Sequence, residues 1–192
     1  NTEGFFFMID VNELRKGVTF EMDGELLKVL DYEHNKSGRG NASIRVKARN
    51  LRTGATYERT FSSGNRVQDV QLDFETVQFL YADSDYFHFM NTETYEQPEV
   101  RAEIMKDAAP YLKEGTEVKL TLYQNEIIDY ELPMSVDLKV IQADVAVRGD
   151  TATGVSKQVT VETGARISVP NFINEGDTIR VNTSTGEYLT RV

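Results

Sequence analysis

Residues 43–49 read Ser-Ile-Arg-Val-Lys-Ala-Arg, a stretch in which polar and apolar side chains alternate at every position. Successive side chains of an extended strand point to opposite faces, so Ile44, Val46 and Ala48 share one face and the basic side chains share the other. A period of two predicts a half-buried β-strand, here with a wholly basic outer face. The stretch therefore indicates a β-sheet in this part of the chain.

Short runs of the same kind continue on both sides of this strand. Strands are expected at residues 17–20, 26–30, 57–61, 77–81, 86–90, 117–123, 126–132, 137–143, 158–161, 166–170 and 178–181. Turn residues separate them at 23–24, 53–54, 63–64, 125, 175–176 and 185–186. Many short strands at a spacing of about 8–12 residues predict small all-β barrels or sandwiches. Only residues 63–69 and 99–112 are helix candidates.

The net charge of −10 is distributed unevenly, and this predicts domain boundaries. Residues 8–72 carry 11 Lys and Arg against 9 Asp and Glu, residues 73–134 carry 4 against 14, and residues 135–192 carry 6 against 7. Each piece has about 60 residues, the lower end of what folds alone. We therefore expect three small β barrels in tandem, at 8–72, 73–134 and 135–192. No long linker separates them, so we expect them to pack in a fixed geometry.

Composition excludes several classes of protein. No apolar run approaches the roughly 20 residues that a membrane-spanning helix needs. The chain has no Cys, which excludes a disulfide framework and a thiolate metal site and fits a reducing cytoplasm. Residues 1–7 lack the features of a signal peptide, and we interpret them as an expression remnant or short extension before a natural start at Met8.

The loop before the basic strand contains an arginine between two glycines, Gly38-Arg39-Gly40, preceded by Ser37. Glycine permits unusual backbone angles and close approach, so the loop is expected to be exposed with Arg39 at its tip. Arginine has a permanent charge and five donors, which suit phosphate or ribose. An ordinary hairpin with a solvated arginine is the alternative. The spacing does not match a Walker motif.

Basic residues are concentrated around this loop. Residues 36–66 hold eight basic side chains against one acidic side chain, Glu58. The candidate phosphate-binding residues are Lys36, Arg45, Lys47, Arg49 and Arg52. Such a density is typical of a nucleic-acid footprint, and a solvated strand face is the alternative.

Ordered motifs across the whole chain resemble those of bacterial elongation factor P. They are Arg15-Lys16-Gly17, residues 50–54, Arg59-Thr60-Phe61, residues 89–97, Glu131-Leu132-Pro133, residues 147–151 and residues 185–191. The C-terminal signature is represented by Lys157, Gly164, Ile167, Val169-Pro170, Ile173 and Gly176. Val159 departs from the usual Ala, a small apolar change within a strand. The resemblance runs from Met8 to Val192.

The resemblance implies an N-terminal SH3-like (KOW-type) barrel followed by two OB-like barrels, in an L shape similar to tRNA. It implies a cytoplasmic translation factor that binds the ribosome and its RNA beside the peptidyl-tRNA and relieves stalling at consecutive prolines. Arg39 matches the position that many members modify, so a modifying enzyme is a candidate partner. Gly40 departs from the branch that attaches a sugar to arginine, which leaves a bare Arg39 as the alternative.

Two further sites follow from the resemblance. Gly149, Asp150 and Thr151 match a loop that approaches the exit-site codon, which makes mRNA a candidate partner. Tyr188 and Arg191 match the terminal motif of the family, with strand packing as the alternative interpretation.

We expect no catalytic residue, no metal, no cofactor, no membrane partner and a monomer. A single-strand-binding OB fold is one rival, although its aromatic candidates lie in the acidic middle third, where we expect them to form core and interface: Tyr81, Tyr86, Phe87 and Phe89. An enzyme is the other rival. Its only support is a pair of carboxylates, Asp83 and Asp85, and the two histidines, His34 and His88; the pattern at 83–85 is more typical of a turn.

Overall fold

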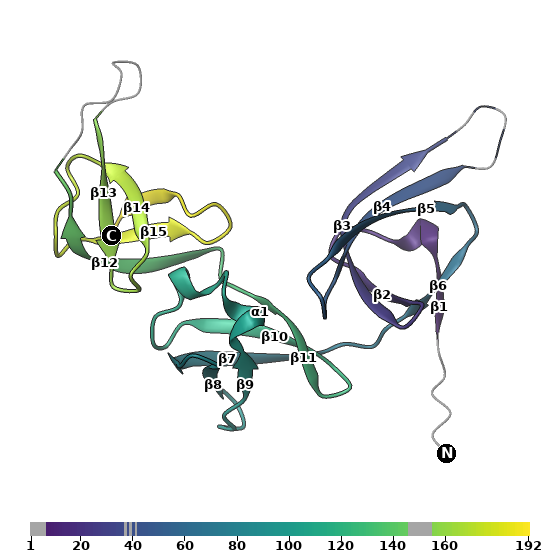
Figure 1. Cartoon of the computed structure of the whole chain (residues 1–192), viewed down its shortest axis with the longest axis horizontal. Helices are drawn as coiled ribbons and strands as arrows, with labels where there is room; N and C mark the ends of the chain where they lie inside the picture. Colours follow the sequence, from purple (N-terminus) through teal and green to yellow (C-terminus); the bar gives the residue numbers. More distant parts are fainter. Residues whose placement is uncertain (1–6, 37, 39, 41, 146–154) are drawn as a thin grey trace. The chain divides into compact units, whose positions relative to one another are not determined.

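The computed structural model describes residues 7–36, 38, 40, 42–145 and 155–192 (Figure 1). These residues form three β-sheets, one for each third of the chain. The prediction of an all-β fold is confirmed.

The first sheet has six strands in the order β1-β6-β2-β3-β4-β5. The bounds are β1 Met8–Asp10, β2 Thr19–Met22, β3 Glu25–Asn35, β4 Ser43–Asn50, β5 Thr56–Ser62 and β6 Arg66–Asp69, with a short 3-10 helix, η1, at Val11–Glu13. The inward side chains of β4, Ile44, Val46 and Ala48, are fully buried, as the alternation predicts. Phe20 is also fully buried, and its ring meets Phe61 edge to face. Each such burial contributes about 1.5–3 kcal/mol for a large side chain.

The helix prediction at residues 63–69 is wrong. Residues Arg66–Asp69 form β6, which pairs with both β1 and β2. Gly64 has a φ of +90°, which turns the chain out of β5 before a helix could begin. Val67 is buried in the barrel core, so pairing and burial outweigh the weak local helical pattern.

The second sheet contains β7 Asp73–Ala82, β8 Tyr86–Asn91, β9 Glu99–Arg101, β10 Glu117–Tyr123 and β11 Glu126–Glu131. Between β9 and β10 lie a single helical turn, α1 Ala102–Met105, and a 3-10 turn, η2 Ala109–Tyr111. The long helix considered at 99–112 is therefore wrong in extent. Residues Glu99–Arg101 belong to β9, and Pro110, which has no backbone N–H, could not donate the hydrogen bond that a continuous α-helix needs at its position.

The third sheet contains β12 Ser135–Ala143, β13 Ser156–Val161, β14 Arg166–Pro170, β15 Thr178–Asn182 and β16 Tyr188–Arg191. Its order is β14-β13-β12-β15-β16, and the second sheet has the order β9-β8-β7-β10-β11. When the strands of each of these two sheets are numbered from 1 in chain order, both sheets have the strand order 3-2-1-4-5. The middle and C-terminal thirds thus share one five-stranded topology, typical of an OB fold, although no repeat is visible in the sequence.

The chain divides into two compact units, which we describe separately. The first unit comprises residues up to Asp73 together with Leu122–Ile128, the tip of the β10–β11 hairpin. Gln124 and Asn125 form this two-residue turn with φ values of 50° and 65°. The Tyr123 hydroxyl donates to Glu21 at 3.1 Å. Burial raises the pKa of Tyr123, and the bond to Glu21 raises it further.

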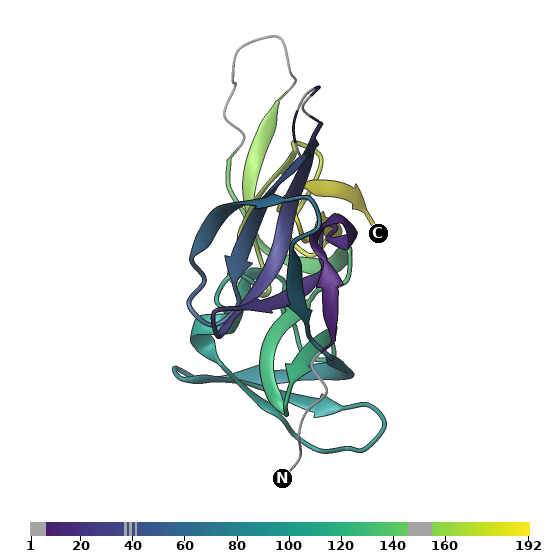
Figure 2. The same cartoon turned by 90° about the vertical axis from the view of Figure 1, so that its right-hand side faces the viewer.

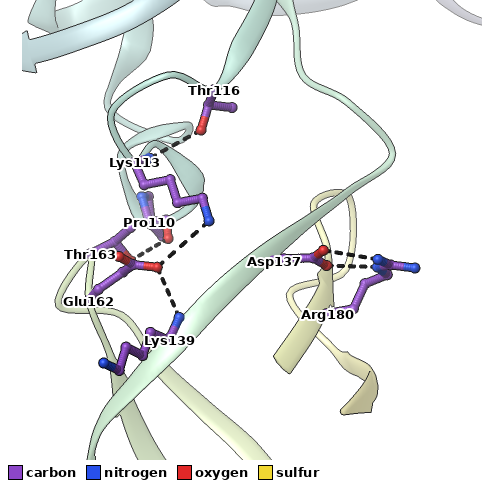
Figure 3. A network of polar contacts seen from close by, with 8 residues as sticks. All are labelled: Pro110, Lys113, Thr116, Asp137, Lys139, Glu162, Thr163 and Arg180. Carbon is purple, nitrogen blue, oxygen red and sulfur yellow. Dashed lines mark hydrogen bonds and ion pairs between the residues drawn. The ribbon is translucent and has the colours of Figure 1, made fainter. Parts of the chain in front are cut away.

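The second unit comprises residues 74–121 and 129–192, and polar bonds connect its two sheets (Figure 3). The Thr163 hydroxyl donates to the Pro110 carbonyl at 2.7 Å. The Glu162 carboxylate accepts from the Lys139 amide at 2.9 Å and lies 3.9 Å from the Lys113 ammonium. Gly186 has a φ of +73°, which favours glycine, and a Cβ added there would lie 2.9 Å from the Tyr111 hydroxyl and displace that side chain. These polar contacts thus hold the middle and C-terminal thirds of the chain together within this unit.

An ion pair on the third sheet joins neighbouring strands. Asp137 and Arg180 are cross-strand partners, and two hydrogen bonds of 2.7 and 2.9 Å link the guanidinium to the carboxylate (Figure 3). The Arg180 guanidinium lowers the pKa of Asp137 below its ordinary value. The pair therefore contributes to the register of β12 and β15.

Candidate nucleic-acid interface

Strand β5 pairs with β4 along residues 43–49, and β3 and β4 form the hairpin ribbon that leads to the loop before β4 (Figures 1 and 2). Their pairing runs from Leu27 opposite Asn50 to Asn35 opposite Ser43, with a bulge between Val29 and Asp31. A bulge increases the local twist of an antiparallel pair. The ribbon leads directly into the loop that carries the predicted tip.

The predicted tip residues are only partly within the described structure. Lys36, Gly38 and Gly40 are exposed, as expected for a loop at the end of a ribbon. Ser37 and Arg39 lie outside the described residues, and so do Gly149, Asp150 and Thr151 in the C-terminal third.

The outer face of the ribbon carries Arg45, Lys47 and Arg49, all exposed, as the alternation predicts. The strand register, however, places carboxylates beside two of them. Glu33 lies opposite Arg45, and Asp31 lies opposite Lys47. Glu58 of β5 lies opposite Lys47 on its other side. Directly opposed side chains are about 4.5–5.5 Å apart at Cβ, so these carboxylates reduce the local positive potential.

The strand register therefore makes the outer face of β4 less positive than a count of charged residues along the sequence indicates. The charge count over residues 36–66 leaves out Asp31 and Glu33, but the pairing of β3 with β4 places both carboxylates beside the basic strand. The alternation of Asp31 and Glu33 with Tyr32 was the signal that could have shown this, because it places both carboxylates on one face. The outer face is a mixed-charge surface with its densest positive end near Arg49 and Lys28, which oppose each other.

Arg52 lies in the turn between β4 and β5. The buried Asn50 side chain accepts from the backbone amides of Arg52 and Thr53 at 2.9 and 3.0 Å, which fixes this turn. The Arg52 guanidinium lies 3.2 Å from the Glu126 carboxylate, and both groups are about half exposed. An exposed pair of this kind contributes about 0–1 kcal/mol, so Arg52 can exchange this partner for a phosphate at little energetic loss.

Tyr188 and Arg191 lie on the same strand, β16, with different neighbours. Tyr188 packs against the core of the C-terminal barrel and lines an open groove with Val155, Ser168 and Pro170. The Arg191 guanidinium lies 5.6 Å from the centre of the exposed Phe172 ring and 3.8 Å from the Asp177 carboxylate. The structure therefore gives Tyr188 a packing role and presents Arg191 beside an exposed aromatic ring.

The carboxylates at residues 83 and 85 belong to the hairpin between β7 and β8. One Asp83 oxygen accepts from the backbone amides of Asp85 and Tyr86, both at 2.8 Å. The other lies 2.8 Å from Nε2 of His88, whose ring stacks on Tyr81 at 4.3 Å. The His88 bond, followed by the two amides, lowers the pKa of Asp83 from 3.8 to about 2. This geometry is that of a capped turn.

We expect Asp83→Asn to reduce the acid sensitivity of the middle barrel. A carboxyl group whose pKa is lowered in the folded state stabilises that state above its unfolded pKa, and this contribution is lost as the pH falls from about 4 to about 2. Urea unfolding at pH 5, 4, 3 and 2 should show a shallower loss of stability for the variant than for the wild type. Asp85→Asn controls for the change in net charge. Equal pH slopes in wild type and Asp83→Asn would contradict the assignment.

Within the described part of the chain, no cluster of three or more His, Asp or Glu side chains has a geometry that could hold a metal ion. Among the same residues, no helix has the length and apolar character needed to cross a bilayer.

Three family models match the chain one after another. The elongation factor P KOW-like domain matches residues 10–67, the elongation factor P OB domain matches residues 72–130, and the model described as elongation factor P, C-terminal, matches residues 136–191. The matches follow the three sheets in order and cover most of the chain. The chain belongs to the elongation factor P family. It is thus a translation elongation factor, and the family relationship implies interaction with the ribosome and tRNA.

Solved structures of similar fold include eukaryotic translation initiation factor 5A from Methanococcus jannaschii. That protein is 22% identical, with a TM-score of 0.50, and the match covers 66% of this chain and 92% of that one. A translation initiation factor eif-5a family protein from Naegleria fowleri is 15% identical, with a TM-score of 0.44, over 66% of this chain and 99% of that one. The similarity to the first of these supports the all-β fold of this elongation factor P family member.

Proposed function

We propose that this elongation factor P family member is a non-enzymatic, cytoplasmic factor that binds the ribosome beside the peptidyl-tRNA. In this proposal it promotes peptide-bond formation at consecutive prolines. The single observation that carries the proposal is the complete, ordered series of family domains from residue 10 to residue 191. The exposed β3–β4 ribbon, which leads to the Arg39 loop, supports it.

The proposed mechanism is one of positioning. The ring of proline fixes φ, which stiffens a nascent chain that contains several prolines. Holding the acceptor end of the peptidyl-tRNA in a reactive geometry lowers the entropic part of the barrier without any chemical step by the protein. Arg39 would contact the backbone of that acceptor end, and the glycines beside it, Gly38 and Gly40, would permit close approach. A modified or a bare Arg39 is compatible with this role, and the first requires a modifying enzyme.

Phosphate contacts would supply most of the affinity. We propose Lys36, Arg45, Lys47, Arg49 and Arg52 as contacts to tRNA or ribosomal RNA. Contacts of this kind position a protein without specifying sequence, and they make binding depend on salt. Since Asp31, Glu33 and Glu58 lie beside Arg45 and Lys47, we expect the salt dependence to be smaller than eight basic residues would give.

The C-terminal barrel would provide the second set of contacts. We propose that Gly149, Asp150 and Thr151 approach mRNA in the exit site, where a carboxylate can accept from a base or from a 2′-hydroxyl. Arg191, beside the exposed ring of Phe172, offers a charged group near a surface on which a base can stack. The factor would act as a monomer and without a cofactor.

Reconstituted translation tests this proposal. A reporter with consecutive prolines and a matched reporter with separated prolines are translated with and without the protein, prepared in a host that lacks arginine-modifying enzymes. We expect faster synthesis of the first reporter only, which would also show that Arg39 acts bare. Stimulation only by protein from its natural host would indicate that modification is needed. No stimulation by either preparation would refute the proposed function.

A further inference from the structure

We propose that Tyr95 is the central contact of a protein-docking surface on the middle barrel, and that it receives a lysine- or arginine-rich protein segment exposed on the ribosome. The surface is formed by residues 91–97, where the chain turns between β8 and β9. It is separate from the RNA contacts proposed above, which lie in the first and last thirds of the chain. The inference rests on the proposed function, because the partner segment belongs to the ribosome.

One turn in each third of the chain closes on an asparagine with the same hydrogen bonds. The three asparagines are Asn50, Asn91 and Asn182. Each side-chain oxygen accepts from the backbone amides two and three residues later, at 2.8 to 3.1 Å. Each backbone carbonyl accepts from the amide four residues later, at 2.8 to 3.0 Å. A threonine three residues after each asparagine accepts from the amide two residues beyond it, so the three turns can be compared residue by residue.

The residue four positions after the asparagine has a positive φ in all three turns. In two of them it is a glycine, Gly54 with a φ of 76° and Gly186 with a φ of 73°, whereas in the middle barrel it is Tyr95 with a φ of 62°. Glycine adopts this left-handed backbone without steric cost, but a bulky side chain does not. The turn therefore favours glycine at this position, and a tyrosine there strains the backbone.

Packing within the chain does not offset this strain. The Tyr95 side chain is 71% exposed, and none of the described residues forms a hydrogen bond or a ring contact with it. Strained backbone conformations are concentrated at positions where the side chain has a functional role. Tyrosine is also among the residues that contribute most to the binding energy of protein interfaces. Strain and exposure together thus indicate that the ring contacts a partner molecule.

The charges around the ring favour a basic protein over RNA. Glu93 and Glu96 flank Tyr95, and both are exposed. The middle third as a whole, residues 73–134, carries 4 Lys and Arg against 14 Asp and Glu. A cation over the face of a tyrosine ring is attracted by the ring, and nearby carboxylates add to this attraction, whereas they repel a phosphate. A lysine or arginine side chain is therefore the group that this surface accepts.

Tyr95→Gly separates a binding role from a structural one. Glycine removes the strain, so we expect the thermal midpoint of the second compact unit, measured by scanning calorimetry, to rise by about 2–4 °C. Gly54→Tyr introduces the same strain into the first barrel, where an added Cβ would approach the Arg49 guanidinium at 3.9 Å, an ordinary van der Waals distance. We expect the midpoint of the first unit to fall by a similar amount. A lower midpoint for Tyr95→Gly would assign the ring a packing role and overturn the inference.

The primary experiment measures the affinity of Tyr95→Gly for purified ribosomes with tRNA in the peptidyl site. We expect the affinity to fall about tenfold, as for other tyrosines at the centre of an interface. Tyr95→Phe keeps the ring and should bind within about twofold of the wild type. Phe74→Ala is the matched control, because it removes another exposed aromatic ring from the same barrel, and we expect it to bind like the wild type.

A double variant, Glu93→Gln with Glu96→Gln, tests the charge of the partner. Glutamine retains a hydrogen-bond acceptor but has no charge, so binding to a basic segment should weaken about threefold. Binding to RNA would instead become stronger, because two repelling charges are lost. A photoreactive benzoyl-phenylalanine at Gln97, an exposed position of the same turn, identifies the partner. We expect a crosslink to the ribosome that a protease removes and ribonuclease does not.

The outcomes separate this inference from the proposed function. If the wild type does not bind ribosomes, both fail. If the wild type binds and Tyr95→Gly binds equally well, the docking surface is overturned while the function stands. Tighter binding of the double glutamine variant, or a crosslink that ribonuclease removes, would assign the turn to RNA and overturn the protein partner. A crosslink between two copies of this chain in the absence of ribosomes would overturn the ribosomal partner.

Discussion

Arg39→Ala should abolish most of the stimulation of a consecutive-proline reporter while leaving ribosome affinity within about twofold. In the proposed mechanism Arg39 acts at the acceptor end of the tRNA, whereas most phosphate contacts lie elsewhere, on the ribbon and in the C-terminal barrel. We expect a decrease of about tenfold or more in the rate of peptide-bond formation between prolines, equivalent to at least roughly 1.4 kcal/mol in the barrier. Single-turnover synthesis and a separate binding titration measure the two quantities.

Two variants make this result interpretable. Arg101→Ala removes an exposed arginine of β9 and controls for the loss of one positive charge. Arg39→Lys retains the charge without the guanidinium fork, so partial activity would show that geometry matters in addition to charge. Full activity of Arg39→Ala would remove the loop tip from the mechanism. Loss of rate and affinity in equal proportion would make Arg39 a general binding residue.

Phe20→Ala should strongly destabilise the first compact unit and leave the stability of the second unit unchanged. Phe20 is fully buried, and its ring packs edge to face on Phe61 with a centroid distance of 6.4 Å. Truncating a buried phenylalanine costs about 3–5 kcal/mol. A barrel of about 60 residues has a free energy of unfolding of only roughly 3–9 kcal/mol, so the loss is a large fraction of the total.

Amide hydrogen exchange with peptide resolution can follow both units in one sample. We expect protection to fall by a factor of about 100 or more in β2, β3 and β4 and to stay unchanged in β12 and β15. Phe7→Ala, at a position of the same unit that is 72% exposed, is the matched control and should change little. Equal loss of protection in both units would show that they unfold as one cooperative body and would contradict the division.

Local pattern predicted most strands because burial on one face imposes a period of two. Strand β4 is the clearest example, with Ile44, Val46 and Ala48 buried and the basic residues between them exposed. The same local reasoning failed at residues 63–69, where the pattern is weakly helical and the pairing of β6 with β1 and β2 is decided by residues far along the chain. The shared 3-2-1-4-5 topology of the second and third sheets is equally invisible to local pattern, because different side chains fill the two cores.

In the candidate site, too, local sequence predicted some features and only tertiary contacts determined the others. The sequence predicted an exposed loop at Gly38-Arg39-Gly40, whose Arg39 lies outside the described residues, and it correctly placed Arg45, Lys47 and Arg49 on one face, because alternation fixes the face of a strand residue. The sequence could not predict that the Arg15 guanidinium lies over the Tyr32 ring, because that contact joins the end of η1 to β3 across 17 positions of the chain. Nor could a charge count along the chain show that Asp31 and Glu33 lie beside Lys47 and Arg45.

The sequence by itself determined the all-β class, the three-part charge pattern and, through its ordered motifs, the elongation factor P family. These properties depend on side-chain period, composition and order, all of which are local. Only the tertiary structure decided which charges neutralise one another and which arginines lie on aromatic rings. Strand register and the burial of Val46 between β3 and β5 set those contacts, and register is fixed by the packing of the whole barrel.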